Sequence, residues 1–317
     1  MKSTGRFTAD LRRLMQHSYD HCQSCGGAIA KGTAAFAGYD SKSRPLYVGP
    51  CCQSLIEELA THVYWWWEVD KRCAADLSLW RYMDFAKFVS LLENKAIYFA
   101  RADTLGDPFE GAAGTAERQP EWDSFYVKFF RDAIATVPGR KEAPSEEELN
   151  QQSARLLTDL KKIGETDRLR TFVSCWHANS GESEALWRLY CPLPSPGVAI
   201  QTTVGRLEES LGDDPNIRIG KVQYIDFKQG FAGFHDRIFW KRKSLSHETE
   251  VRAIIQSHKE QSDKGRLVSA KLEILIRQVV PSPFAPAWFH DLINKILERY
   301  GTNALVRKSE LLSQPFY

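Results

Sequence analysis

The stretch "LWRYMDFAKFVSLLENKAIYFARADTLGDPFEG", residues 79–111, predicts the fold more clearly than any other part of the sequence. Leu79–Tyr82 is rich in aromatic residues and favours a strand, whereas Phe85–Leu92 has apolar residues at helical spacing. Ala96–Ala100 is again β-like, and Asp103–Gly111 is a polar turn in which a proline restricts the backbone. The stretch therefore predicts a strand, a helix, a second strand and a loop.

The rest of the chain is helix-rich over residues 116–162 and changes to short β-like runs after residue 169. These runs are "RTFVSCW", "GVAIQTT", "NIRIGKVQYIDF", "EVRAIIQS" and "RLVSAKLE". We expect a short helix at "ESEALWRLY", an amphipathic helix near the C-terminus and a surface loop at "VPGRKEAPSEEE", residues 137–148. Because strands and helices do not alternate strictly, the sequence predicts an α+β fold.

The composition is typical of a globular protein. Of 317 residues, 43% are hydrophobic and 26% are charged, with a formal net charge of +2. The longest apolar run, Val63–Trp67, is too short to span a bilayer, and the N-terminal segment has no apolar stretch of the signal-peptide kind. We therefore expect a cytoplasmic protein without a membrane partner.

Four of the seven cysteines lie in the first sixth of the chain. Cys22 and Cys25 have the Cys-x-x-Cys spacing of a zinc knuckle, and the two glycines that follow allow the chain to turn back beneath an ion. A second pair, Cys51 and Cys52, follows an expected hairpin. In a reducing cytosol such a cluster favours a metal over disulfides. We expect a Zn²⁺ that is structural, since four protein ligands leave no open position.

The fourth ligand stays open at the level of sequence. Adjacent cysteines seldom bind the same ion comfortably, so Cys52 competes with His17, His21 and His62 for the last position. The alternative to a metal site is a set of free or buried thiols.

The cysteine pairs also predict how the chain is divided. An apolar-periodic stretch, Leu55–Val69, predicts a helix that carries Trp65–Trp67. We expect residues 1–75 to form the zinc module with this connecting helix, and residues 76–317 to form one α+β domain.

Several motifs after the zinc module occur in a recognisable order: the stretch 79–111, then "TFVSCWHANSGESEALWRLYCPLPSPGVAIQ", "KVQYIDF", "KRKSLSHETEVRAI" and "VVPSPFAPAWFHDLINKILERYG". From about Leu79 to Ser309 the chain resembles a bacterial family known as a domain of unknown function, family 2971. Its members tend to have an aromatic-rich opening strand, a Gly-Asp-Pro-Phe-Glu loop and a Glu-x-Glu-x-Arg strand. The chain departs from the family at Cys175–His177, "CWH", where members often have Phe-Ser.

The same pieces resemble the three-part layout of ADP-ribosyltransferase-like folds. This resemblance implies a split, bent, mostly antiparallel sheet with flanking helices, and a protein that consumes NAD as an ADP-ribosyltransferase or NAD glycohydrolase, for example a toxin or an antiviral defence effector. It implies that Arg81 and Tyr82 on the first strand and Ser174 on the second hold NAD. Glu250 on the late strand would stabilise the positive charge that develops on the ribose. Glu248, on the same strand face, would deprotonate the protein, nucleic-acid or water acceptor.

Further residues are candidates for a nucleotide pocket. Trp176 and Trp187 are candidate walls for a flat base, and Asp107 lies in the Asp-Pro-Phe-Glu turn. Each has a structural alternative, in which the tryptophans belong to the core, Asp107 caps the turn and Ser174 is an ordinary strand serine.

Two other functions fit the sequence. In the first, the protein is a non-catalytic adaptor that binds nucleic acid or protein through its zinc module, and the local cluster "FWKRKSLSH", residues 239–247, contacts phosphates. In the second, Glu248, Glu250 and Lys243 form a magnesium-dependent nuclease site. Motifs of other catalytic classes, such as GxSxG, the P-loop, GxGxxG and HExxH, do not occur.

Overall fold

The structure is a computed structural model, and it describes residues 21–22, 25–28, 36–39, 45–48, 51–52, 62–65, 73–135, 143–192, 196–212, 214, 216–257 and 260–317. Three expectations from the sequence lie outside these residues, in whole or in part. They concern His17 as a ligand, residues 55–61 and 66–69 of the helix predicted over 55–69, and the first half of the loop predicted over 137–148.

The chain divides by its internal contacts into two units. The first consists of residues 1–72 with 116–163, and the second of residues 73–115 with 164–317. The sequence predicts one boundary, after residue 75, and in the division by contacts residues 116–163 group with residues 1–72.

A small antiparallel sheet in the first unit contains β1 (Phe36–Tyr39), β2 (Pro45–Val48) and β3 (His62–Trp65), in the order β2-β1-β3. The hairpin β1–β2 lies between the two cysteine pairs in the sequence, as predicted. The helix predicted through Trp65 is wrong over β3, because these residues pair with β1 along their whole length. Val63, Tyr64 and Trp65 are residues that favour strands, and here this preference prevails over the helical spacing upstream.

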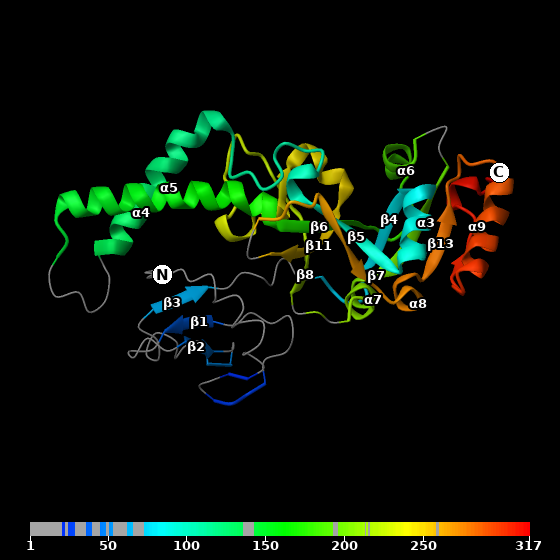
Figure 1. The fold of residues 1–317 in the computed structure, drawn as a ribbon, viewed down its shortest axis with the longest axis horizontal. Coiled ribbons are helices and arrows are strands. Elements are labelled where there is room, and N and C mark those ends of the chain that lie inside the picture. Colours follow the sequence, from blue (N-terminus) through cyan, green and yellow to red (C-terminus); the bar gives the residue numbers. More distant parts are fainter. Residues whose placement is uncertain are drawn as a thin grey trace. The chain divides into compact units, whose positions relative to one another are not determined.

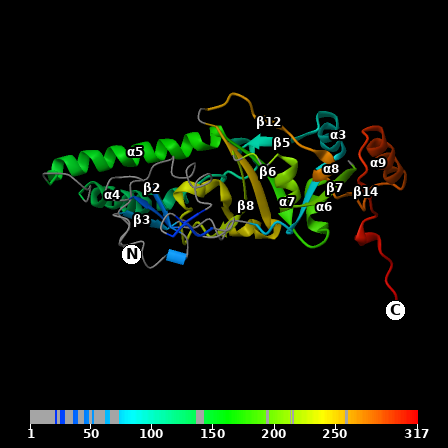
Figure 2. The same cartoon turned by 90° about the horizontal axis from the view of Figure 1, so that it is seen from below.

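Two helices make up the remaining described part of this unit. The 3₁₀ turn η4 (Ala116–Arg118) leads into α4 (Gln119–Ala135), and α5 (Glu146–Arg170) continues into the second unit (Figure 1 and Figure 2). Ion pairs join opposite ends of the two helices. Lys161 Nζ lies 2.6 Å from Asp123 Oδ2, and Arg131 Nη2 lies 2.6 Å from Glu146 Oε2. The helices therefore run antiparallel, which confirms the helix-rich segment predicted here.

A sheet of nine strands forms the described core of the second unit. The strands are β4 (Ser78–Asp84), β5 (Ala96–Arg101), β6 (Thr171–Ala178), β7 (Gly197–Thr203), β8 (Ile217–Lys221), β11 (Glu250–Gln256), β12 (Gly265–Ser269), β13 (Gln278–Pro281) and β14 (Leu305–Val306). Apart from the parallel pair β13–β14 the pairings are antiparallel. This mostly antiparallel sheet with flanking helices confirms the α+β class.

Strand β6 is the junction of the sheet (Figure 1). Along one edge it pairs with β11 over seven residues, and β11 continues to β8. Along the other edge β6 pairs with β5 through Phe172 and Val173, but with β4 through His177 and Ala178. Strands β4 and β5 therefore diverge beside Ser174 and its neighbours.

Helices cover the sheet unequally. The helices α3 (Phe85–Asn94), α7 (Val204–Ser210), α8 (Leu272–Leu275) and α9 (Trp288–Arg299) contribute to the largest apolar core, which also takes Phe172 and Trp176 from β6. Because side chains alternate along a strand, Val173 and Cys175 face the other side. That side is covered by α6 (Glu184–Tyr190) and by 3₁₀ segment η5 (Phe234–Phe239), whose Phe239 packs against Val173.

The remaining elements are short. The parallel pair β9 (Gln223–Ile225) and β10 (Trp240–Arg242) stands apart from the main sheet, and η6 (Lys243–Glu248) follows β10 directly. Segments η3 (Ala102–Thr104) and η7 (Glu310–Leu312) are single turns. Within the described ranges, no helix combines the length and the apolarity that crossing a bilayer requires.

Candidate metal centre and charged cluster

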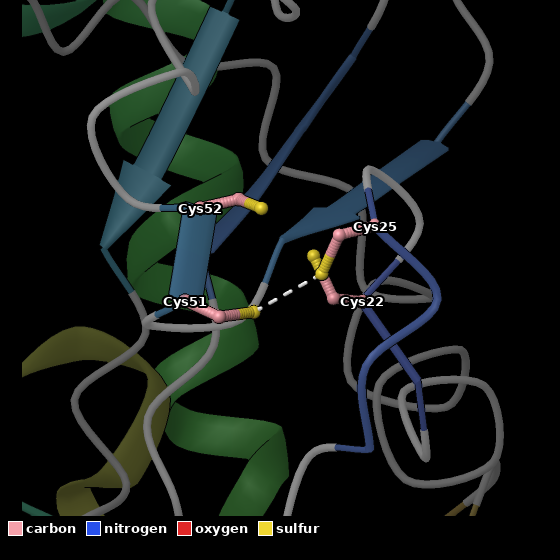
Figure 3. A group of neighbouring side chains, drawn as sticks. All are labelled: Cys22, Cys25, Cys51 and Cys52. Atoms are coloured by element: carbon pink, nitrogen blue, oxygen red, sulfur yellow. Dashed lines mark hydrogen bonds between the residues drawn. The ribbon is translucent and has the colours of Figure 1, made fainter.

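Four cysteine side chains converge in the first unit (Figure 3). The Sγ atoms of Cys22, Cys25, Cys51 and Cys52 all lie within 4.8 Å of one another. A hydrogen bond of 3.5 Å between the Sγ atoms of Cys25 and Cys51 joins the two pairs. Cys22 and Cys52 are buried, and Cys25 and Cys51 are exposed. This group could hold a metal ion.

A tight turn brings the first pair into position. The backbone N–H of Gly26 donates to the carbonyl of Cys22, and the N–H of Cys22 donates to the carbonyl of Gly27, each at 2.7 Å. Gly26 has a φ of +73°, a conformation that L-residues rarely adopt. The N–H of Gly27 also points at Cys25 Sγ, 3.4 Å away. The turn therefore requires a glycine at position 26, and the backbone of Gly27 closes it.

The donor set fits a tetrahedral zinc ion. A Zn–S bond of about 2.3 Å in tetrahedral geometry puts neighbouring sulfurs about 3.8 Å apart, between the 3.5 Å contact and the 4.8 Å limit observed here. The hydrogen bond with Cys25, followed by desolvation and the neighbouring Cys22, raises the pKa of the Cys51 thiol to about 12. The Cys51 thiol therefore resists ionisation unless a cation offsets its charge.

The structure gives the positions of two of the candidates for the fourth ligand. Cys52, one of the alternatives that the sequence left open, lies with the other three cysteines. His21 is exposed, and its backbone pairs with Ala28 rather than placing the imidazole in the group. His62 lies on β3, and its side chain is outside the described part of the chain.

A second set of functional side chains lies in the second unit and is called the charged cluster here. It consists of Glu110, Lys241, Glu248, Glu250 and Arg252, all buried. Lys241 Nζ donates to Glu248 Oε2 at 2.7 Å and to Glu250 Oε2 at 3.0 Å. Arg252 donates from Nη1 and Nη2 to both carboxylate oxygens of Glu110, at 2.6 and 2.7 Å, and from Nε to Glu250 Oε1 at 2.7 Å.

The pairing in the charged cluster decides what Glu250 can do. Burial alone would raise the pKa of Glu250, but the charges of Arg252 and Lys241 hold it at about 2. The same pairing raises the pKa of Lys241 against the effect of its own burial. Glu250 is therefore a permanently ionised carboxylate with both oxygens bonded to cations, and it is a poor proton acceptor.

The predicted arrangement of Arg81, Ser174 and Glu250 around one cleft is wrong. Arg81 Nη1 does donate to Ser174 Oγ at 2.9 Å, and Nη2 donates to the carbonyl of Tyr98 across the divergence of β4 and β5. In the β6–β11 register, however, Glu250 lies opposite His177, and Ser174 lies opposite Ala253. Because facing residues share a side of the sheet, Glu250 is on the side opposite to Arg81 and Ser174.

The aromatic candidates are also divided between the two sides. Trp176 is buried beside Ser174, to whose Oγ its indole N–H donates at 3.1 Å, and its ring lies 5.4 Å from the Arg81 guanidinium. On the other side Tyr82 and Trp187 meet edge to face at 4.9 Å in a separate apolar cluster. Both tryptophans are fully buried, so they are core residues rather than walls of an open pocket.

Tyr82, Trp187 and His177, on the same side of the sheet as Glu250, are held by hydrogen bonds. Tyr82 Oη accepts from the N–H of Ser183 at 2.9 Å, and Trp187 Nε1 donates to Glu182 at 2.9 Å. His177 is buried, and its Nδ1 donates to the carbonyl of Glu248 at 2.8 Å. Burial lowers the pKa of His177, so the imidazole is neutral at pH 7.

The Asp-Pro-Phe-Glu loop is attached by ion pairs at both ends. Asp107 Oδ1 lies 2.7 Å from Arg242 Nη2 and also accepts from the backbone N–H of Phe109 at 3.1 Å. Glu110 is bound by Arg252. The sequence analysis assigned Asp107 to a ligand and missed Glu110, Lys241, Arg242 and Arg252 as a set. A signal was present in the "FWKRKSLSH" cluster, which contains two of these cations.

The magnesium site predicted from Glu248, Glu250 and Lys243 stays a prediction, and in the structure both carboxylates are bonded to Lys241. Within the described residues, the cysteines are the group of His, Cys, Asp or Glu side chains whose ligand atoms gather closely enough for one ion. Lys241, rather than the predicted Lys243, is the lysine that contacts Glu248 and Glu250, and Lys243 is exposed.

Comparison of the chain with models of protein families, with characterised proteins and with solved structures gives no match. The function is therefore argued from the geometry of the two sites.

Proposed function

We propose that the protein is a zinc-containing adaptor, in which Cys22, Cys25, Cys51 and Cys52 hold a structural Zn²⁺ and the zinc module contacts nucleic acid or another protein. The observation that carries the proposal is the convergence of four Sγ atoms within 4.8 Å. Four protein ligands complete the tetrahedral shell and leave no position for a substrate, so the ion stabilises structure and takes no part in chemistry.

The first prediction concerns metal content. Protein purified without chelators is expected to contain about one zinc per chain, because a Cys₄ site binds Zn²⁺ with high apparent affinity at pH 7. Replacing the metal by Co²⁺ should give thiolate-to-metal charge-transfer absorption. Cys25→Ser should lose both signals, since Cys25 is exposed and its removal alters mainly the ligand set.

The matched control for this prediction is Cys191→Ser. Cys191 is a buried cysteine outside the group, and its Sγ donates to the carbonyl of Met83 at 3.4 Å, a contact that a serine hydroxyl preserves. This variant should keep its zinc. A wild-type zinc-to-protein ratio near zero, with no Co²⁺ charge-transfer band, would contradict the proposal.

A second candidate function is the consumption of NAD that the resemblance implies. One observation favours it, namely the divergence of β4 and β5 along β6 with Arg81 bonded to Ser174 at 2.9 Å. This agrees with a split sheet and with two of the three signature pieces. Against it stands Glu250, which is on the other side of the sheet and bonded to Arg252 and Lys241.

The second prediction separates the two functions. When the protein is incubated with NAD labelled in its nicotinamide and adenosine parts, with and without cell lysate, the adaptor proposal predicts neither release of nicotinamide nor transfer of label. Turnover that falls by about two to three orders of magnitude in Glu250→Gln would establish the NAD-consuming function instead. A melting curve of the variant should accompany the assay, so that loss of turnover is not confused with unfolding.

A further inference from the structure

A pocket of about 490 Å³ lies in the second unit beside the Asp-Pro-Phe-Glu loop. Its volume is in the range of pockets that take small organic ligands. The loop supplies Phe109, the region around β9 supplies Phe227 and Lys228, and the β10–η6 junction supplies Arg242 and Lys243. The pocket is separate from the charged cluster, because none of the five cluster residues is among those that line it.

One wall of the pocket is aromatic. The rings of Phe109 and Phe227 lie 5.2 Å apart with a tilt of 33°. Phe109 is half-buried, so part of its ring remains accessible. A ring of this kind offers a stacking surface for a flat heterocycle, and stacking of a base on an aromatic side chain tolerates any base.

The other wall is cationic. Arg242, Lys228 and Lys243 line the pocket together with a single carboxylate, that of Asp226. Both lysines are exposed, and the Arg242 side chain keeps 41% of its surface accessible. Arg242 is paired with Asp107, so the three cations face two carboxylates, and the local charge is positive by one because of the two exposed lysines. Such a surface attracts phosphate groups.

Asp107 links the aromatic wall to the cationic wall. Its carboxylate pairs with Nη2 and Nε of Arg242, and it also accepts from the N–H of Phe109. The Arg242 guanidinium is thereby held 5.0 Å from the Phe109 ring centre. Among the described residues no partner is found for Nη1, so this nitrogen is available to a ligand.

We propose that this pocket binds a phosphorylated nucleotide, with the base against Phe109 and the phosphates at Arg242, Lys228 and Lys243. The ligand chemistry is a flat base joined to phosphate, carried either by a free nucleotide or by a single nucleic-acid strand. The proposal goes beyond the zinc adaptor and is independent of it, since all of the residues that it uses lie in the second unit.

The third prediction is tested by calorimetric titration of the full-length protein with four probes: ADP, adenosine, inorganic pyrophosphate and a ten-residue oligothymidylate. ADP should bind at least about 10-fold more tightly than adenosine, which lacks phosphate, or pyrophosphate, which lacks a base. Higher salt should weaken the binding of ADP and leave the binding of adenosine nearly unchanged. Tighter binding of the oligonucleotide than of ADP identifies a nucleic-acid strand as the source, and the reverse order identifies a free nucleotide.

Variants test the two walls separately. Phe109→Leu keeps an apolar side chain without the aromatic face. It should lower the affinity for whichever of ADP and the oligonucleotide binds more tightly by about 10-fold. Lys243→Ala should weaken it by several fold and reduce its salt dependence. Lys295→Ala, an exposed lysine on α9 outside the pocket, is the matched control and should bind as the parent does.

Three results would overturn the nucleotide proposal. They are no binding of ADP or the oligonucleotide at millimolar concentration, equal affinity for ADP and adenosine, and affinities that neither pocket variant changes. The zinc content of each variant should stay that of the parent. If the protein contains zinc but binds no nucleotide, the nucleotide proposal is contradicted and the zinc-adaptor proposal is not. If the protein binds nucleotide but contains no zinc, the zinc-adaptor proposal is contradicted and the nucleotide proposal is not.

Discussion

Replacing Cys22 by Ser is expected to release the zinc and to unfold the cysteine module, which comprises the four cysteines and the sheet β1–β3. Structural Zn²⁺ in small Cys-rich modules has an apparent binding free energy of about 10–16 kcal/mol, and most of it is folding free energy. The three strands have four residues each, too few to be stable without further support. Cys22 is buried, so the serine would also place a hydroxyl at a buried position where the thiolate had bound the metal.

Limited proteolysis measures this effect directly. Loss of about 3 kcal/mol of local stability raises the population of the open, cleavable state by about 100-fold, and the rate of cleavage between the cysteine pairs should rise accordingly. A chelator added to the parent protein should produce the same cleavage, and re-addition of Zn²⁺ should reverse it. Cys191→Ser, which keeps the ligand set, should be cleaved at the rate of the parent. Unchanged cleavage in Cys22→Ser would mean that the module folds without metal.

The cysteine site was predictable because its information is local. A Cys-x-x-Cys spacing followed by two glycines specifies a turn, and in the structure both glycines are used by that turn. Only the pairing with Cys51 and Cys52 is long-range. The helix predicted to end the module failed over His62–Trp65, since strand pairing with β1 is a tertiary contact that periodicity does not contain.

The arrangement on the large sheet was not predictable in the same way. The sequence showed that Arg81, Ser174 and Glu250 lie on strands, and all three do. Which side each faces depends on register, and a change of one residue moves every side chain to the other face. Ser174 lies opposite Ala253 in the β6–β11 pairing, so these two side chains are on the same side of the sheet. Glu250 is three residues from Ala253 along β11, and its side chain is therefore on the other side.

The charged cluster depends on still longer connections. Glu110 belongs to a loop and Arg252 to a strand 142 residues later, and they meet only because the whole sheet is assembled. The resemblance implied that Glu248 and Glu250 are a catalytic pair. In the structure Arg252 donates to both Glu250 and Glu110, a contact that the sequence pattern does not contain.

Arg252→Met is expected to destabilise the second unit by about 3–5 kcal/mol, the usual cost of removing one partner from a buried ion pair. The Arg252 side chain is fully buried and donates to Glu110, Glu250 and the carbonyl of Ile238. Methionine fills much of the same space, so the loss reflects three buried carboxylates, those of Glu110, Glu248 and Glu250, left with Lys241 alone rather than a cavity. Chemical denaturation followed by the fluorescence of the buried Trp176 and Trp187 measures the change.

The control for Arg252→Met is Arg307→Met. Arg307 is half-exposed and lies 3.9 Å from Glu310, a surface pair expected to contribute at most about 1 kcal/mol. The triple variant Glu110→Gln, Glu250→Gln, Arg252→Met distinguishes the physical cause. Because it removes the two carboxylates together with the arginine, it should recover a large part of the loss. A triple variant as unstable as the sum of its single changes would show that the arginine stabilises the sheet by packing, and that charge balance between Glu110, Glu250 and Arg252 is not what holds the cluster together.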